Sequence, residues 1–172
     1  SPYALQKLIG EQYGKLFQQL YGLDTVALRY FNVFGPRQDS SSPYSGVISI
    51  FSRCLAEGLQ PVIYGDGEQT RDFTYVDNVV DGTLRACTAP RAAGRVINVS
   101  CGDRVTLNTL FKLMRQFSGV EVQPKFAELR AGEVRHSQAD ISRARALLGY
   151  QPVVAFQEGL RRTIKWYQAQ GV

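Results

Sequence analysis

The 172-residue sequence has few of the residues that build metal sites and disulfide frameworks. It contains three cysteines, Cys54, Cys87 and Cys101, which lie far apart, and a single histidine, His136. An odd and sparse set of thiols is more typical of a reducing compartment than of a disulfide-stabilised secreted protein. These residues also lack the spacing of metal ligands. We therefore expect a cytoplasmic protein without a bound metal.

Long apolar runs and segregated charge are absent as well. No stretch approaches the roughly 18 apolar residues that a membrane span requires, and the first residues do not resemble a signal peptide. Since the sequence does not begin with Met, we expect a trimmed chain or one that begins inside a gene. The net charge is +5, but the arginines are dispersed and accompany no nucleic-acid recognition motif. We expect neither a membrane nor a nucleic acid partner, and the charge suits a small anion such as a diphosphate.

What is present is an alternation of helical and strand patterns. Apolar residues at three- and four-residue steps predict helices at residues 3–20, 47–58, 77–88, 107–117, 141–148 and 155–168. Short runs of β-branched and aromatic residues predict strands at residues 25–31, 61–64, 95–99 and 122–126. Asp77 and Asp140 are the predicted N-caps of their helices. A helix that ends at Gly22 and leads into a buried strand is typical of a parallel α/β layer, so the predicted fold class is α/β.

Tyr3 and Lys7 are the first candidates for chemistry. Four residues apart, they project from one face of the first predicted helix, where an ammonium favours a phenolate. Lowering a phenol pKa from about 10 to near neutrality requires about 4 kcal/mol, more than one exposed lysine supplies, so a second cation such as a nicotinamide ring would help. By itself, this pair also fits an ordinary surface contact. Gly10 and Gly14 continue the same face and predict a close backbone approach there.

The pair belongs to a longer series of motifs. In chain order they are Ser1-Pro2-Tyr3-Ala4-x-x-Lys7, Arg29-Tyr30-Phe31-Asn32-Val33-Phe34-Gly35-Pro36, Gly65-Asp66-Gly67 and Arg71-Asp72-Phe73-x-Tyr75-Val76. Their order and spacing resemble the extended short-chain dehydrogenase/reductase family of NAD-dependent epimerases and dehydratases, over the whole chain. Two segments look most like UDP-N-acetylglucosamine and UDP-glucose 4-epimerases: Phe31-Asn32-Val33-Phe34-Gly35-Pro36-Arg37-Gln38-Asp39 and Gly132-Glu133-Val134-Arg135-His136-Ser137-x-Ala139-Asp140.

The resemblance implies a role for each matching residue. Tyr3 would act as base and then acid, and Lys7 would lower its pKa; both would contact NAD. The residues implied for a UDP-sugar are Asn32, Arg71 and Arg135 at the diphosphate, Arg130 and Glu133 at the phosphates and ribose, and Gly46, Val47, Val62 and Tyr64 around the uracil. The family often has Asp where Glu133 stands. Plain structural alternatives are a turn-forming Asn32, a solvated Arg71, and Val62, Ile63 and Tyr64 as core strand residues.

The same resemblance implies an incomplete fold. No Gly-x-x-Gly-x-x-Gly follows a predicted strand, although such a loop brings a dinucleotide pyrophosphate to a helix N-terminus. We expect residues 1–31 to be a remnant of the NAD-binding Rossmann domain. Residues 32–172 would mainly bind the nucleotide sugar, with residues 76–100 packing back on the Rossmann sheet. The chain would be the C-terminal half of its parent, without the dinucleotide-binding βαβ units.

The implied reaction of the parent enzyme is C4 epimerisation of a UDP-sugar by oxidation, rotation of the ketose and re-reduction. We expect this chain to be inactive in isolation and not to bind NAD stably, so whether it is itself an enzyme stays open. One alternative is a nucleotide-sugar 4,6-dehydratase or decarboxylase, and another is a non-catalytic sugar-nucleotide-binding or structural module. Exposed Rossmann faces predict a homodimer or other association.

Overall fold

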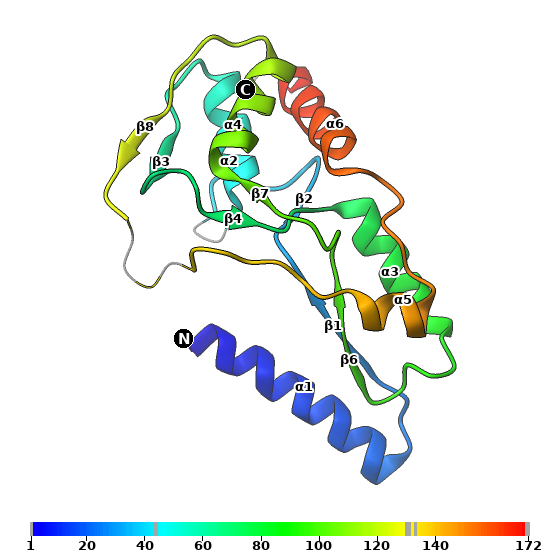
Figure 1. Cartoon of the computed structure of the whole chain (residues 1–172). Coiled ribbons are helices and arrows are strands. Elements are labelled where there is room, and N and C mark those ends of the chain that lie inside the picture. The colour runs from blue at the N-terminus through cyan, green and yellow to red at the C-terminus, as the bar shows by residue number, and fades with distance from the viewer. Residues whose placement is uncertain (1, 43–44, 130–131, 133, 171–172) are drawn as a thin grey trace.

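The structure is a computed structural model, and it describes residues 2–42, 45–129, 132 and 134–170. Helix α1 (Pro2–Tyr21) lies along one end of the molecule. Next to it is a pair of strands, and most of the other elements gather at the opposite end (Figure 1). The described elements therefore form two packed groups, one around this pair of strands and one at the opposite end.

The group nearest to α1 contains the parallel layer that the sequence predicts. Strand β1 (Val26–Tyr30) pairs in parallel with β6 (Arg95–Val99), with Leu28 opposite Ile97. Successive side chains of β1 point to opposite faces. Arg29 binds Glu11 of α1, and the hydroxyl of Tyr30 bonds with Thr83 of α3 (Val76–Thr88). The two helices therefore cover opposite faces of β1, which confirms an α/β layer.

The second group is built from short strand pairs and three helices. Strands β2 (Val33–Phe34) and β5 (Thr74–Tyr75) pair in parallel, as do β3 (Val62–Tyr64) and β8 (Lys125–Ala127). Strand β4 (Thr70–Arg71) pairs antiparallel with β7 (Val105–Thr106). The helices are α2 (Val47–Ala56), α4 (Leu107–Ser118) and α6 (Phe156–Ala169). The sequence predicted the helices and β3 but not the two-residue strands.

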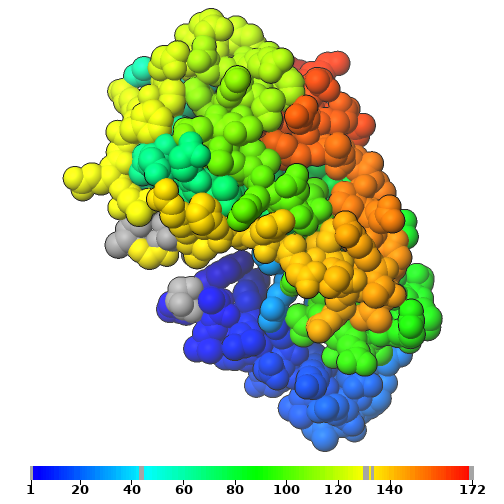
Figure 2. Space-filling model, in the orientation of Figure 1, coloured from blue at the N-terminus to red at the C-terminus, as the bar shows by residue number. Residues whose placement is uncertain are grey.

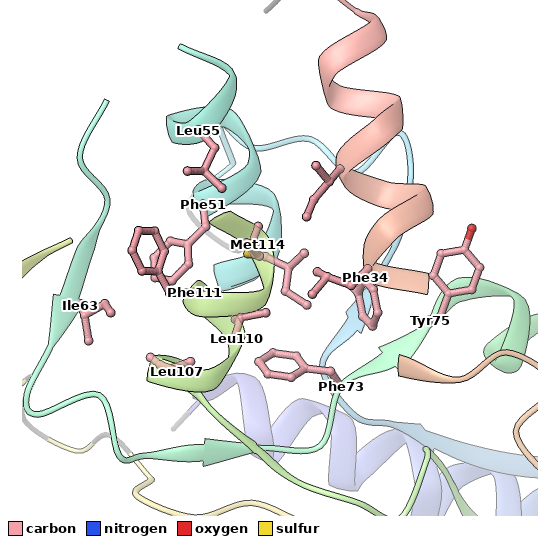
Figure 3. Packing of buried hydrophobic residues seen from close by; sticks show 13 residues of the cluster. Phe34, Phe51, Leu55, Ile63, Phe73, Tyr75, Leu107, Leu110, Phe111 and Met114 are labelled. Carbon is pink, nitrogen blue, oxygen red and sulfur yellow. The ribbon is translucent and has the colours of Figure 1, made fainter. Parts of the chain in front are cut away.

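An aromatic core holds this second group together. Phe51 of α2 meets Phe111 of α4 edge to face, with ring centroids 5.8 Å apart. Phe73 stacks on Phe156 of α6 at 5.7 Å. Figure 3 shows the side chains of α2 and α4 interleaving around the fully buried Met114. Each buried aromatic side chain removes a large apolar area from water, so this core fixes α2 and α4 relative to the strands beside them.

The helix and strand boundaries correct three details of the sequence prediction. Helix α3 begins at Val76 with Tyr75 as its N-cap, so Asp77 lies in the first turn and is not the cap. Helix α5 (Ser142–Leu148) has Ile141 at its N-cap position, and Asp140, one residue earlier, accepts a hydrogen bond from the Ser142 N–H in the first turn of the helix. Strand β8 begins at Lys125, three residues later than expected, after Pro124. A proline has no N–H to donate to a strand partner, whereas the Lys125 N–H bonds to Pro61.

Helix α1 forms as predicted, but its apolar residues lie at the surface. Every described residue of α1 is exposed or half-buried, including Leu8, Ile9 and Leu16. Figure 2 shows its blue surface along the lower edge of the molecule. At Gly14 the helix does lie close to the segment before β1, because Thr25 Oγ1 donates to the Gly14 carbonyl at 2.7 Å. The close approach predicted at Gly10 is wrong, since a methyl group there would meet no described atom within 4 Å.

Candidate functional site

A cavity of about 640 Å³ lies between the end of β1, the start of α2, and strands β3 and β4. It brings together six of the residues that the sequence singled out for a nucleotide sugar: Asn32, Gly46, Val47, Val62, Tyr64 and Arg71. Its wall also contains buried apolar side chains from the core, among them Phe51, Phe73 and Leu107. A mostly apolar hollow with a few polar groups is typical of a small-molecule site.

Strand β3 lies between the cavity and the core, and its side chains point alternately to one and to the other. Ile63 is fully buried in the aromatic core, whereas its neighbours Val62 and Tyr64 line the cavity. Val62 is 40% exposed, and Tyr64 is half-buried. Side chains of a strand point alternately to its two faces. The two interpretations that the sequence left open, cavity wall and core strand, therefore hold for different residues of β3. Ile63 belongs to the core, while Val62 and Tyr64 belong to the wall.

Asn32 occupies a special backbone position directly after β1. Its φ is +36°, which is unusual for a non-glycine residue. The side-chain Nδ2 donates to the carbonyl oxygen of Asp72 at 3.0 Å, and the Asn32 carbonyl accepts from the Thr74 N–H at 3.3 Å. Asn32 is therefore both a turn residue and a cavity residue, and its side chain is fixed against the segment that follows Arg71.

The two candidate arginines have different surroundings. Arg71 is half-buried and lines the cavity, where its guanidinium donates to the carbonyls of Thr70 at 2.9 Å and Arg135 at 3.3 Å. Arg135 is not among the described residues that line the cavity. Its guanidinium binds Asp66 at 2.8 Å, and both side chains are about half exposed. The pKa of Asp66 is lowered, chiefly by the hydrogen bonds from the Glu68 N–H and from Arg135. The main chain of Arg135 thus supports Arg71, while its side chain pairs with the Gly65–Gly67 turn.

Arg130 and Glu133, the other predicted phosphate and ribose contacts, lie outside the described residues. Gly132, between them, lines the cavity. The described part of this segment therefore passes along the same hollow as Arg71.

Tyr3 and Lys7 lie on one side of α1, as their spacing predicts. The Lys7 ammonium is 5.3 Å from the centroid of the Tyr3 ring, and Tyr3 is 61% exposed. Neither residue is among the described residues that line the cavity. The structure thus brings six of the nine predicted substrate residues together at one cavity and leaves the proposed acid-base pair on a separate exposed helix.

Four further polar residues line the cavity that the sequence analysis missed: Ser45, Cys54, Gln60 and Gln69. Burial raises the pKa of the Cys54 thiol, so it stays neutral near pH 7. The helical step from Val47 to Cys54 could have revealed it, since positions seven apart share a helix face. Gln69 lies two residues before Arg71, on the same side of an extended chain, and its amide donates to the Tyr64 carbonyl at 2.6 Å.

Metal ligands do not gather in the described part of the chain, where no group of three or more His, Cys, Asp or Glu side chains could hold an ion. Instead, His136 bonds through Nδ1 with the hydroxyl of Thr70 at 3.0 Å. Among the same residues, no helix combines the length and apolarity needed to cross a membrane.

Comparison with known proteins identifies the family. The sequence model described as the NAD dependent epimerase/dehydratase family matches residues 1–100. This chain belongs to that family. A UDP-glucose 4-epimerase of Mycolicibacterium smegmatis is 39% identical over 168 residues, which are 98% of this chain and 53% of that protein.

Solved structures of the family show the same fold. A UDP-glucose 4-epimerase of Thermotoga maritima, solved with UDP-glucose, matches with a TM-score of 0.94 and 38% identity. A UDP-N-acetylglucosamine 4-epimerase of Methanobrevibacter ruminantium, in complex with UDP-N-acetylmuramic acid, matches with a TM-score of 0.93 and 44% identity. Each match covers 99% of this chain and 54% of the other chain. The chain thus spans about half the length of the family members it matches, as a part of a Rossmann-type α/β fold.

The family is NAD-dependent, and this chain has candidate partners for one end of that cofactor. Tyr3 and Lys7 offer a hydroxyl and an ammonium on one exposed helix face, which fits the ribose and nicotinamide end of a dinucleotide. The sequence contains no Gly-x-x-Gly-x-x-Gly loop for the pyrophosphate. The residues present therefore fit one end of NAD only.

Proposed function

We propose that this chain provides the sugar-nucleotide-binding part of an NAD-dependent UDP-sugar 4-epimerase, together with its acid-base helix. One observation supports this most strongly: six residues chosen from sequence, on four separate segments, line a single cavity with a guanidinium in its wall. In this proposal, residues 1–31 belong to the cofactor-binding domain. Residues 32–172 mainly bind substrate, and residues 76–100 return to the cofactor side, where β6 pairs with β1.

The cavity suits the two ends of a uridine diphosphate. Val47, Val62 and Tyr64 offer apolar walls for the flat base. Arg71 offers charge-assisted hydrogen bonds of the kind that guanidinium groups make with phosphate oxygens, and Asn32 offers an amide at the same hollow. The guanidinium of Arg135 would release the carboxylate of Asp66 and bind the phosphates instead. Arg130 and Glu133 complete the proposed phosphate and ribose contacts.

Tyr3 and Lys7 would perform the proton transfers. As a phenolate, Tyr3 would take the proton of the C4 hydroxyl, and as a phenol it would return that proton to the same oxygen after the ketose has turned. The Lys7 ammonium would stabilise the phenolate and bind the nicotinamide ribose. NAD, when bound, supplies the acceptor and later the donor of the C4 hydride. Because the proton and hydride that leave are both returned, the net change is inversion at C4.

Calorimetry with UDP tests the binding half of this proposal. The wild-type chain is expected to bind UDP, and Arg71→Ala is expected to bind at least about tenfold more weakly, because one hydrogen bond to a charged group contributes about 1.5–3 kcal/mol. Arg135→Ala should also weaken binding. Arg143→Ala is the matched control, since Arg143 is exposed and donates to the Val96 carbonyl on another surface. Equal loss in Arg143→Ala and Arg71→Ala would contradict the proposal.

The same chain is expected to show no C4 interconversion of UDP-sugars with added NAD, because its residues fit one end of the cofactor only. Measurable turnover by the purified 172-residue protein would overturn that expectation. A 4,6-dehydratase or decarboxylase would use the same cavity and the same Tyr3 and Lys7, and a non-catalytic module would bind UDP without any turnover. We further propose that the chain forms a homodimer or associates through the exposed faces beside β1.

A further inference from the structure

Asp72 is a fully buried carboxylate beside the proposed phosphate-binding arginine. It is 0% exposed, and its oxygens accept hydrogen bonds from three main-chain N–H groups: Cys101 at 3.3 Å, Gly102 at 3.1 Å and Ala139 at 3.0 Å. Within the described part of the chain, no ion pair includes it. Burial raises its pKa, and hydrogen bonds from Ser100 and from these N–H groups oppose the rise.

The geometry requires a carboxylate at this position. Two oxygens with no hydrogen between them can receive three N–H donors, whereas an asparagine has only one acceptor oxygen and turns an NH2 group toward the donors. The three N–H donors come from two separate segments and converge on this one side chain, so the position of the segment that carries Asp72 is tightly specified.

Asp72 links the segments that carry the proposed diphosphate contacts. Its carboxylate holds the turn after β6 and the chain at Ala139, four residues beyond Arg135. Its own carbonyl accepts from the side chain of Asn32 at 3.0 Å. The preceding strand β4 is tied to the same chain, because the Thr70 N–H donates to the Arg135 carbonyl at 2.9 Å. Asp72 is thus bonded to each segment that supplies a proposed diphosphate contact.

We propose that Asp72 is a positioning residue for the diphosphate site, where its buried carboxylate sets the placement of Asn32 and Arg71 at the cavity. This inference rests on the proposed function, since it assumes that the cavity binds a nucleoside diphosphate. Asp72 itself would not touch the ligand. It is not among the described residues that line the cavity.

The test compares Asp72→Asn with a variant of matched stability, using UDP as the probe. We expect Asp72→Asn to weaken UDP binding at least tenfold by calorimetry. Leu160→Ala removes a fully buried side chain of α6 that does not line the cavity. It should bind UDP within twofold of wild type even when its melting temperature falls as far as that of Asp72→Asn. In NMR spectra of Asp72→Asn, the main-chain amides of Cys101, Gly102 and Ala139 should shift together with the side-chain amide of Asn32.

A milder variant covers the case in which Asp72→Asn does not fold. Ser100→Ala removes the hydroxyl that bonds to Asp72 and to Thr74 Oγ1, the latter at 2.9 Å, and should weaken UDP binding two- to fivefold. Unchanged affinity in a folded Asp72→Asn, or in Ser100→Ala when the first variant is unfolded, would overturn the positioning role and leave the proposed function intact. Failure of the wild-type chain to bind UDP would overturn both.

Discussion

Gly159 lies where α6 meets β5, and the contact leaves no room for a side chain. A methyl group at this position would lie 2.6 Å from Tyr75 Cγ and 2.8 Å from Tyr75 Cβ, and Tyr75 is itself buried. Gly10 occupies an equally helical position in α1 but faces open space. An alanine therefore fits in place of Gly10 but clashes with Tyr75 in place of Gly159.

We predict that Gly159→Ala lowers the free energy of unfolding by about 1–3 kcal/mol, because an overpacked core must shift to admit the methyl group. Gly10→Ala is the matched control and should raise it by about 0.5–1 kcal/mol, the usual gain from replacing glycine inside a helix. Urea denaturation of both variants measures the difference. A stabilised Gly159→Ala would show that α6 does not approach β5 this closely.

At the scale of residues, the sequence predicted which groups line the cavity better than it predicted their partners. The resemblance of the motifs to those of a known family located Asn32, Val62 and Arg71, and all three line one hollow. The pairing of Arg135 with Asp66 joins residues 69 positions apart, and no local pattern encodes it. The carboxylate of Asp72 accepts from N–H groups of two distant segments, so these partners too could not be read from its neighbours in the chain.

At the scale of elements, α1 is joined to β1 by one well-formed ion pair. Arg29 donates to both carboxylate oxygens of Glu11, at 2.6 and 2.7 Å. The Glu11 side chain is 13% exposed, whereas that of Arg29 is 51% exposed. The hydrogen bond and charge of Arg29 lower the pKa of Glu11, although partial burial opposes the change.

We predict that Glu11→Gln destabilises the protein by about 1 kcal/mol at pH 7, near the upper end for pairs open to solvent. A carboxyl whose pKa is lowered on folding adds stability above its unfolded pKa, about 4.3 for Glu. This contribution is lost as the pH falls through the lower folded pKa. The difference between wild type and Glu11→Gln should therefore be constant from pH 7 to about 5 and shrink as the pH falls below the unfolded pKa of about 4.3. Denaturation curves from pH 7 into the acid range check it, and a difference that grows as the pH falls would contradict the ion pair.

The longer elements were predictable and the shortest strands were not. Helices α2, α4 and α6 have apolar residues at helical steps, and β6 has a run of β-branched residues, so their positions follow from the sequence. Strands β2, β4, β5 and β7 have two residues each, too few to show any period. They exist because distant segments pair with them, as Thr70 does with Thr106.

At the scale of the whole molecule, apolar surface is concentrated beside β1. Leu8, Ile9, Leu16 and Phe17 of α1 are each 43–46% exposed. On the other face of β1, a hollow of about 570 Å³ is lined by residues of β1, α3 and the segment after it. In the structure, β1 pairs with β6 and with no other described strand. The other edge of β1 thus has no strand partner among the described residues, and an unpaired edge beside exposed apolar side chains is suited to association.

We predict that the purified chain self-associates as its concentration rises, which sedimentation velocity would measure. Leu16→Glu should reduce this association, because it places a charge within the apolar face of α1 without removing a buried contact. Leu84→Glu, on the exposed side of α3, is the control for a single added charge. A chain that stays monomeric at high concentration would contradict association through the faces beside β1.

The most direct test of the account is NMR titration of the ¹⁵N-labelled chain with UDP. If the cavity binds the nucleotide, the amide signals of Gly46, Val47, Tyr64 and Arg71 should shift with one common affinity. Signals of Cys87 and Thr88, which line the other hollow, should stay in place. Shifts confined to Cys87 and Thr88, or no shifts at saturating UDP, would contradict the claim that this chain binds a sugar nucleotide in the predicted cavity.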